Sequence, residues 1–353
     1  MGLPSLKQPF AVGSIETPAG EIPRVSASLS GSDRIGSFKA RWGVGRMRYT
    51  IDPGIYALGS PDEHAPVLVT ANYKMSFDRL RESLPDLNAW ILVLDTNGIN
   101  VWCASGKGTL GTDELVNRIE SSGLSRIVSH RRLILPQLAG PGVAAHHVKK
   151  RSGFRVIYGP IRAADLRAFL DRGCEATPEM RTKAFPMSER LVLIPVELVS
   201  ALKWAVLIIA VLFVLSGVVG RQGFWTNALS HGLLGAVAIL ASVMAGAVLT
   251  PLLLPWLPGR AFSLKGLWLG LGAAMILLFL RMDAMGTWTG RLEIIGWVLM
   301  IPAATMYLAM NFTGASTYTS LSGVKREMRW ALPVEIGVGV VGCAVWVASF
   351  FIS

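Results

Sequence analysis

Long apolar runs in the second half of the sequence constrain the fold more than any other feature. A transmembrane α-helix needs about 20 apolar residues to cross the hydrocarbon core of a bilayer. Five runs come close to that length, the third being the shortest: 199–219, 229–253, 264–280, 292–310 and 332–351. The chain is 52% hydrophobic and only 16% charged, and the charged residues lie mostly in its first half. We therefore predict a soluble domain, a linker at 181–198 and an all-α transmembrane domain of about five helices at 199–353.

The basic charge of the chain fits a membrane boundary better than a nucleic acid. The formal net charge is +11, but the sequence contains no compact basic stripe with interleaved aromatic residues, so no nucleic-acid partner is expected. Basic residues collect on the cytoplasmic side of membranes, where they also attract anionic lipid. Many lie close to the expected spans: Arg181, Lys183, Arg190, Lys203, Lys325, Arg326 and Arg329. We predict a multi-pass protein of the inner (cytoplasmic) membrane, in contact with membrane lipid, with its soluble domain in the cytoplasm.

The expected spans have the composition of an anchor. The sequence shows no cluster of carboxylates or histidines like a proton relay within them, since Asp283 and Glu293 lie near a segment boundary. The first residues of the chain contain no apolar stretch that resembles a signal peptide. We therefore expect the apolar helices to anchor the domain that precedes them.

Strand and helix patterns alternate in the first half of the chain. Short apolar runs predict strands at 66–70, 89–94, 126–128, 132–135 and 154–158, with helical patterns between most of them. This alternation is typical of an α/β domain with a largely parallel sheet, here a Rossmann-like domain at 61–180. Ligands bind such sheets at the carboxyl ends of the strands, where Thr70, Thr96 and Gly140 are expected. Residues 1–60 are expected to form an irregular, strand-rich extension.

A cysteine follows the strand predicted at 89–94. The sequence at 100–107 is Asn-Val-Trp-Cys-Ala-Ser-Gly-Lys, and glycines follow at 108 and 111. Cys103 is therefore expected between a strand and the next helix, which we predict to begin with Thr112 as its N-cap. The positive end of a helix and Lys107 can hold a cysteine in the thiolate form, which ligates metals. The pattern indicates a single-thiolate site beside a glycine-rich segment.

Two other interpretations of Cys103 remain open on the residues alone. It could be a buried structural cysteine, because free cysteines are often buried. It could also be a nucleophile, although no spacing selects a partner among the histidines at 130, 146 and 147. A phosphate-binding P-loop is excluded, because Val101 stands where that motif needs glycine and Gly108 stands where it needs Ser or Thr.

The cysteines also limit which cofactors the chain can bind. The sequence has three, Cys103, Cys174 and Cys343, without CxxC spacing. An iron–sulfur cluster needs about four thiolates, so this chain alone is not expected to bind one. A disulfide is not expected either, because Cys343 lies in an apolar run and the other two lie in a domain expected in the cytosol.

The motif at 100–107 resembles the signature of the corrinoid-binding domain shared by the large subunit of the corrinoid iron–sulfur protein and the mercury-methylating corrinoid proteins of anaerobes. The similarity continues through 108–112, returns at 135–146 and covers about residues 65–175. It implies a cobalamin or related corrinoid, with Cys103 as the lower axial ligand of cobalt. Together with the strand ends, it gives the expected cofactor-binding residues: Asn100, Val101, Trp102, Cys103, Ala104, Ser105, Gly106, Lys107, Gly108, Thr109, Gly111, Thr112, Thr70, Thr96, Gly140, Pro141 and Gly142.

Resemblance to the mercury-methylating branch implies a cobalamin-dependent methyltransferase that moves a methyl group from cobalt to Hg(II) and produces methylmercury. A thiolate below cobalt is a strong donor and makes transfer of methyl as a carbanion equivalent more accessible. The expected spans fit this branch, because the corrinoid iron–sulfur subunit is soluble and carries its own cluster-binding cysteines. The alternatives are a membrane-anchored corrinoid methyl carrier of one-carbon metabolism, similar to the acetyl-CoA pathway, and a non-catalytic membrane sensor.

The same resemblance implies two protein partners. Cobalt would need reduction after each turnover, and this chain is not expected to hold a cluster. A ferredoxin-like protein with two [4Fe–4S] clusters is therefore expected as electron donor. A methyltransferase that uses methyltetrahydrofolate is expected to supply the methyl group.

Overall fold

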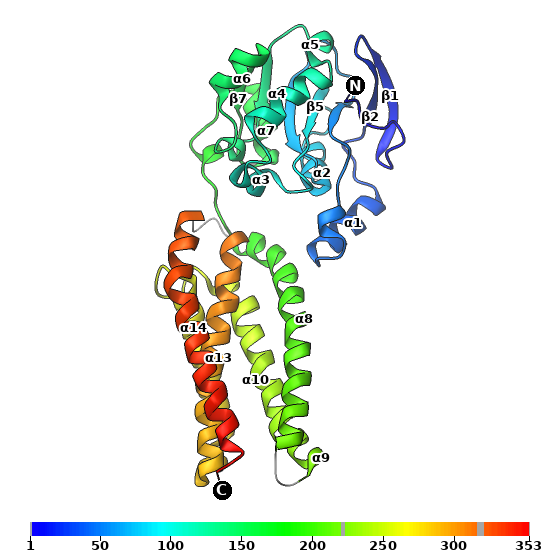
Figure 1. Cartoon of the computed structure of the whole chain (residues 1–353). Helices are drawn as coiled ribbons and strands as arrows, with labels where there is room; N and C mark the ends of the chain where they lie inside the picture. Colours follow the sequence, from blue (N-terminus) through cyan, green and yellow to red (C-terminus); the bar gives the residue numbers. More distant parts are fainter. Residues whose placement is uncertain (1, 220–222, 316–320, 353) are drawn as a thin grey trace. The chain divides into compact units, whose positions relative to one another are not determined.

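The computed structural model describes residues 2–219, 223–315 and 321–352 of the chain (Figure 1). These residues form two compact units. An α/β unit comprises Met1–Ala40 and Val44–Ala184, and a helical unit comprises Arg41–Gly43 and Phe185–Ser353.

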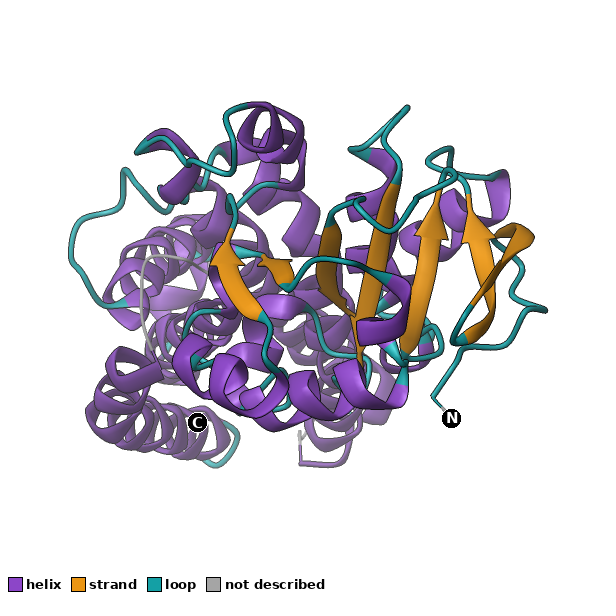
Figure 2. Cartoon of the chain, turned by 90° about the horizontal axis from the view of Figure 1, so that it is seen from above, coloured by secondary structure: helices purple, strands orange, loops and turns teal. Residues whose placement is uncertain are grey.

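Seven strands form one sheet in the α/β unit, in the order β1-β2-β3-β5-β4-β6-β7 (Figure 2). The strands are β1 (Ala11–Thr17), β2 (Gly20–Val25), β3 (Gly54–Leu58), β4 (Val67–Ala71), β5 (Ala89–Leu94), β6 (Arg132–Leu135) and β7 (Arg155–Tyr158). The strand predicted at 132–135 and the one predicted at 89–94 are confirmed residue for residue. The short strand expected at 126–128 is wrong, because Leu124–Ile127 forms the helix α5.

The sheet is mixed rather than largely parallel throughout. Strands β5, β4, β6 and β7 run parallel to one another. Strand β3 pairs with β5 in the antiparallel sense, and β2 and β1 continue the sheet beyond it. The N-terminal residues therefore widen the sheet itself, and the boundary expected at residue 60 falls between two of its strands.

Alternation along β5 explains why the sheet is covered on both faces. Trp90, Leu92 and Leu94 point to one apolar cluster, whereas the residues between them point to the other. The first cluster includes side chains of α4 (Thr112–Ser121), α5 and α6 (Ala145–Ser152), and the second includes those of α2 (Lys74–Glu82) and α7 (Leu166–Asp171). Each fully buried large apolar side chain contributes about 1.5–3 kcal/mol, so these two layers hold the unit together.

The order of the strands reverses direction at β4. From β4 the chain passes through α2 to β5 on one side, and from β5 it passes through α3 (Val101–Lys107), α4 and α5 to β6 on the other side of β4. Ligands of open α/β sheets bind outside the carboxyl ends of the strands at such a switch in direction. The loop that contains the cysteine motif leaves β5 at this edge.

A buried ionic cluster fixes the helix α1 (Gly31–Arg41) to the start of α2. Lys74 Nζ lies 2.6 Å from Asp33 Oδ1 and 2.7 Å from both carboxylate oxygens of Asp78. Arg81 contacts both carboxylates and also donates to the carbonyl oxygens of Ser26 and Ser28. All four charged side chains are buried, so every charge in the cluster is balanced by direct contact.

Five helices of the helical unit are long and apolar enough to cross a membrane. They are Met187–Val219 (α8), Phe224–Leu253, Phe262–Leu280 (α12), Trp288–Asn311 (α13) and Ser322–Ser349 (within α14, Leu321–Ser349). The second is built from α9 (Phe224–Asn227), α10 (Leu233–Val243) and α11 (Thr250–Leu253), joined by two π-helical segments. The linker expected at 181–198 is helical from Met187 onward, so α8 begins well before the apolar run that predicted it.

Glycines allow the later helices to pack at short distance. A Cβ atom at Gly270 of α12 would lie 2.6 Å from the Cα of Pro302 in α13. A Cβ atom at Gly296 of α13 would lie 2.9 Å from the carbonyl oxygen of Gly342 in α14. Such close approach is the usual basis of helix association in membranes, where lipid tails are as apolar as the side chains.

Charged groups are buried inside the helical unit. Glu293 is 1% exposed, and its carboxylate lies 2.7 Å from His231 Nδ1 and 3.3 Å from Arg281 NH2. Glu327 of α14 accepts a hydrogen bond from the backbone N–H of Ser263 at 2.7 Å, and Glu335 is also buried. Folding thus brings Glu293 together with His231, which is distant in the sequence, but the described residues contain no group of three carboxylates, histidines or cysteines.

Candidate functional site

The loop that follows β5 is held by Asn72, which lies at the end of β4. Its side-chain oxygen accepts hydrogen bonds from the backbone N–H groups of Thr96 at 3.0 Å and Gly98 at 3.1 Å. Its side-chain nitrogen donates to Asp95 at 3.1 Å. The neighbouring strands β4 and β5 therefore fix the loop jointly, and the loop delivers the chain to the start of α3.

The cysteine motif forms a short helix rather than a turn between strand and helix. Asn100 is the N-cap of α3, and its side-chain oxygen accepts a hydrogen bond from the backbone N–H of Cys103 at 3.0 Å. Cys103 therefore lies in the first turn of α3. Gly108 ends the helix in the left-handed conformation, with φ of 82°, which favours glycine.

One face of α3 is buried and the remainder is accessible. Ala104 and Ser105 are buried against the unit, while Val101, Trp102 and Cys103 are half-buried. The C-terminal residues Gly106–Gly108 are exposed. Cys103 is a free cysteine that is not sealed in the apolar core, so a buried structural cysteine is the less suitable description of it.

The loop after β6 packs directly against α3. Ser105 Oγ donates to the carbonyl oxygen of Ala139 at 3.2 Å. A Cβ atom at Gly142 would collide with the carbonyl oxygen of Leu110 and come within 2.9 Å of Ser105 Oγ. The structure thus places Gly142 next to the motif, whereas the neighbour of Gly140 is the Gln137 carbonyl oxygen of its own loop. Gly142 itself faces protein backbone.

The start of α4 differs from the prediction. Gly111 is the N-cap of α4, and Thr112 is its first helical residue. Thr112 Oγ1 instead accepts a hydrogen bond from the backbone N–H of Ala144 at 2.9 Å, and so ties α4 to the loop that precedes α6. Thr109 Oγ1 lies 3.4 Å from the carbonyl oxygen of Ala104. These contacts hold the segment 108–112 close to α3.

Besides Ala104 and Ser105, two more of the expected cofactor-binding residues are buried within the protein. Thr70 is 3% exposed and pairs with Val93 inside the sheet. Thr96 is 0% exposed, and its hydroxyl lies 2.8 Å from the side-chain oxygen of Asn72 and 2.7 Å from the carbonyl oxygen of Ile99. Both lie beneath the loop, whereas the other expected residues surround α3 and its neighbouring loop.

An N-terminal segment also borders the site. A Cβ atom at Gly98 would lie 2.7 Å from Thr50 Cγ2 and 3.2 Å from the carbonyl oxygen of Met47. The Arg46 guanidinium lies 6.0 Å from the centre of the Tyr73 ring. The mixture of basic and aromatic residues at 41–49 was the signal that could have drawn attention to this segment.

The donor groups at the site are few. Among the described residues, no three His, Cys, Asp or Glu side chains are grouped as a metal site would need. His146 and His147 are exposed on α6, with ring centres 4.2 Å apart. Cys174 is half-buried, and burial raises the pKa of its thiol above the ordinary value. Cys103, which is half-buried like Cys174, is the cysteine of the motif that follows β5.

Fold and site together define a mixed α/β domain with a half-buried cysteine on a short helix that follows β5, and this domain is followed by membrane-type helices. Residues 45–170 match the family described as CO dehydrogenase/acetyl-CoA synthase delta subunit. The match contains the whole cysteine motif and none of the helical unit.

Curated relatives match a stretch of similar length. The acetyl-CoA decarbonylase/synthase complex subunit gamma of Methanothermobacter thermautotrophicus is 31% identical over 129 residues, which cover 36% of this chain and 28% of the relative. Subunit gamma 2 of Methanosarcina thermophila is 30% identical over 131 residues, covering 36% and 28%. The subunit gamma of Archaeoglobus fulgidus is 26% identical over 129 residues, covering 36% and 27%. The chain thus spans little more than a quarter of these relatives, and its α/β domain is related to them.

Proposed function

We propose that this chain is a membrane-anchored corrinoid methyl carrier of one-carbon metabolism. The observation that carries the proposal is an accessible cysteine, Cys103, within a region that resembles corrinoid-binding domains and matches subunits of acetyl-CoA decarbonylase/synthase complexes. The relatives favour a methyl carrier over the mercury-specific reaction, for which they provide no support.

The donor set of the site fits a corrinoid. A corrin ring provides its own equatorial nitrogen ligands to cobalt, so the protein needs to contribute only one axial donor. A metal bound by protein side chains alone would need several ligands. A single accessible sulfur without a surrounding group of His, Asp or Glu therefore matches the corrinoid and not a bare metal ion.

The residues around Cys103 have distinct proposed roles. We assign Cys103 as the lower axial ligand and Asn100 as the residue that orients its helix through the bond to the Cys103 N–H. The accessible residues of the motif lie next to the cofactor: Val101, Trp102, Gly106, Lys107, Gly108 and Thr109. Gly111, Thr112, Gly140, Pro141 and Gly142 shape the neighbouring loop, and Ala104 and Ser105 fix α3 to it. Because Thr70 and Thr96 are buried, we propose that they position the loop instead of touching the cofactor.

A bound corrinoid would supply a cobalt–carbon bond from which a methyl group is transferred, and the axial donor influences whether methyl leaves as a cation or a carbanion equivalent. The thiolate of Cys103, as a strong donor, favours the carbanion equivalent. This feature, together with the motif itself, supports a second candidate function, which is methylation of Hg(II) to methylmercury.

Both functions need the same classes of partner. A methyltransferase that uses methyltetrahydrofolate would supply the methyl group, and a ferredoxin-like protein with two [4Fe–4S] clusters would return cobalt to its reduced state. The three cysteines of this chain are all free and lie on separate elements, so an external cluster protein is the suitable electron source. The proposed location is the inner membrane, with the α/β domain in the cytoplasm.

An anaerobic absorption spectrum of the full chain reconstituted with cobalamin tests the corrinoid site. We expect a thiolate-ligated, base-off spectrum in the wild type that is lost in Cys103→Ala. The matched control is Cys174→Ala, which removes a half-buried sulfur away from the motif and should leave the spectrum unchanged. Absence of corrin binding in the wild type, or an unchanged spectrum in Cys103→Ala, would refute the ligand assignment.

The methyl acceptor is tested with the methylated, reconstituted chain. Transfer of methyl to an acetyl-CoA synthase centre would support the carrier of one-carbon metabolism. Formation of methylmercury from Hg(II), dependent on Cys103, would support the second candidate. If cobalamin binds but neither acceptor receives the methyl group, the carrier function is wrong while the corrinoid site stands.

A further inference from the structure

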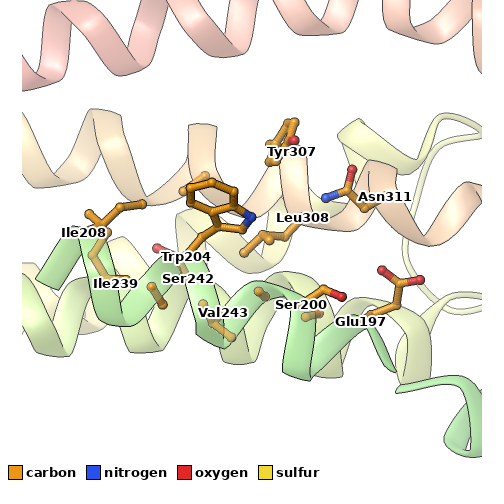
Figure 3. Close-up of a pocket in the computed structure, with 14 residues that line it drawn as sticks. Glu197, Ser200, Trp204, Ile208, Ile239, Ser242, Val243, Tyr307, Leu308 and Asn311 are labelled. Carbon is orange, nitrogen blue, oxygen red and sulfur yellow. The ribbon is translucent and has the colours of Figure 1, made fainter. Parts of the chain in front are cut away.

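Two adjoining cavities lie among the helices of the helical unit. The α8 cavity, of about 410 Å³, is lined by residues of α8, α10 and α13, and the α14 cavity, of about 290 Å³, reaches α14. They share four lining residues, Ile239, Ser242, Ala304 and Tyr307. Figure 3 shows the α8 cavity with the polar residues Glu197 and Asn311 at one end and the apolar residues Ile208 and Ile239 at the other.

Glu335 places a carboxyl group in the wall of the α14 cavity, without a hydrogen-bond partner in the described part of the chain. Its side chain lines this cavity near the middle of α14 and is only 5% exposed. Both carboxylate oxygens are buried and have no hydrogen-bond partner among the described residues. A charged side chain inside a membrane is costly unless it is paired or functional. The carboxylate therefore requires a partner that the surrounding helices do not supply.

The described residues that line the two cavities provide no positively charged partner for Glu335. Among the described residues that line them, none is Lys, Arg or His. The nearby carboxylate of Glu293 differs in this respect, because it contacts both His231 and Arg281. Glu327 also differs, because a backbone N–H of α12 satisfies it. Of these three buried carboxyl groups, Glu335 is the one without a hydrogen-bond partner among the described residues.

The remaining lining residues indicate the class of ligand. The walls are mainly apolar, with the aromatic side chains of Trp204, Tyr307 and Trp297. Aromatic faces attract cations, and a cavity of a few hundred Å³ suits a small organic molecule. A metal ion fits poorly, because the described residues hold no group of three side chains able to ligate one. A neutral lipid chain would fill the space but leave the carboxylate unpaired.

We propose that the membrane helices bind a lipophilic organic cation in these cavities, with Glu335 as its counter-ion. The apolar and aromatic walls accommodate the substituents of the cation, and the buried carboxylate attracts its charge. The site lies within the helical unit and is independent of the corrinoid function.

The test is fluorescence anisotropy of rhodamine 6G, a lipophilic cation, with the full chain purified in detergent. We expect saturable binding that tetraphenylphosphonium displaces, and at least tenfold weaker binding in Glu335→Gln. Glu327→Gln is the matched control, because it removes the same charge from the same helix while an amide oxygen can still accept from Ser263. It should bind as the wild type does.

A second variant tests the cavity without changing charge. Ala304 lines both cavities, so Ala304→Leu should fill the shared space and weaken binding of the dye at least tenfold while Glu335 is intact. Unaltered elution and thermal unfolding would show that each variant is folded. Equal binding of rhodamine 6G to the wild type, Glu335→Gln and Ala304→Leu would overturn the proposal, because it would show that the dye partitions into the detergent. If the neutral dye Nile red bound as tightly as rhodamine 6G, and independently of Glu335, the cavities would be a plain apolar site and the proposal would be wrong. A lack of saturable rhodamine 6G binding to the wild type would also overturn it.

Discussion

Gly142 shows how a single residue shapes the proposed corrinoid site. Its Cα lies so close to the segment 105–110 that a methyl group would collide with the Leu110 carbonyl oxygen. Gly140, in the same loop, has one neighbour within range, the Gln137 carbonyl oxygen at 3.2 Å. The requirement for glycine is therefore much stricter at 142 than at 140, although both occur in the same short sequence.

We predict that Gly142→Ala destabilises the α/β domain by about 1–3 kcal/mol, because overpacking forces the loop away from α3. Gly140→Ala should cost less than Gly142→Ala, because only the Gln137 carbonyl oxygen, at 3.2 Å, has to shift slightly. Chemical denaturation of the full chain, followed by a signal from the α/β domain, measures both. Equal stability of the two variants would contradict this account of the loop.

Asn100 caps α3 through a hydrogen bond from the backbone N–H of Cys103, the proposed cobalt ligand. We predict that Asn100→Ala destabilises α3 by about 1 kcal/mol, because it removes the bond to the Cys103 N–H. That loss corresponds to about fivefold weaker corrinoid binding. Asn100→Asp keeps an acceptor at the same place and should restore most of the affinity. Cobalamin titration compares the variants, and an affinity in Asn100→Ala equal to the wild type would show that the cap plays no part.

At the scale of elements, the junction of α1 with α2 depends on charge. Burial alone would raise the pKa of Asp33, but hydrogen bonds from Lys74, Ser30 and Arg81 outweigh it, so its pKa lies well below the ordinary value. An aspartate in an unfolded chain titrates near pH 3.9. Because the folded state binds the proton less readily, the stability contributed by Asp33 is fully present above about pH 4 and is lost as the pH falls further.

We predict that Asp33→Asn lowers the stability of α1 and α2 at pH 7 by about 3 kcal/mol, since it leaves Lys74 and Arg81 incompletely paired in a buried position. The same variant should lose less stability than the wild type on acidification from pH 5 to lower values. Hydrogen–deuterium exchange of both helices at several pH values measures this. The control is Asp113→Asn, whose exposed carboxylate pairs with Arg151 at the surface and should matter little. Parallel pH profiles of the wild type and Asp33→Asn would argue against the cluster.

At the scale of the whole molecule, the five apolar helices predict an odd number of membrane crossings. With the α/β domain in the cytoplasm, we expect the loop between Leu253 and Phe262 in the cytoplasm and the loop between Leu280 and Trp288 on the opposite side. Alkaline phosphatase fused at 284 should therefore be active, and the same enzyme fused at 258 should be inactive. Green fluorescent protein at these positions should show the reverse pattern, and the opposite results would invert the proposed orientation.

Several features of this protein could be predicted from sequence because they depend on local composition. The apolar runs indicated all five membrane-type helices, since length and hydropathy alone define a candidate span. The strand Ala89–Leu94 was identified because a short apolar run between turn residues is a local pattern. The cysteine motif was likewise found as a short contiguous string, and its resemblance to corrinoid-binding domains needed no knowledge of the fold.

Tertiary structure decided which distant residues act together. The addition of β1, β2 and β3 to the sheet, the helix at Val101–Lys107 and the support of the β5 loop by Asn72 all depend on pairing between separate segments. The burial of Glu335 without a counter-ion depends likewise on the helices that surround it. Hydropathy and motifs are properties of neighbours along the chain, whereas strand order, close approach and charge compensation are properties of neighbours in space.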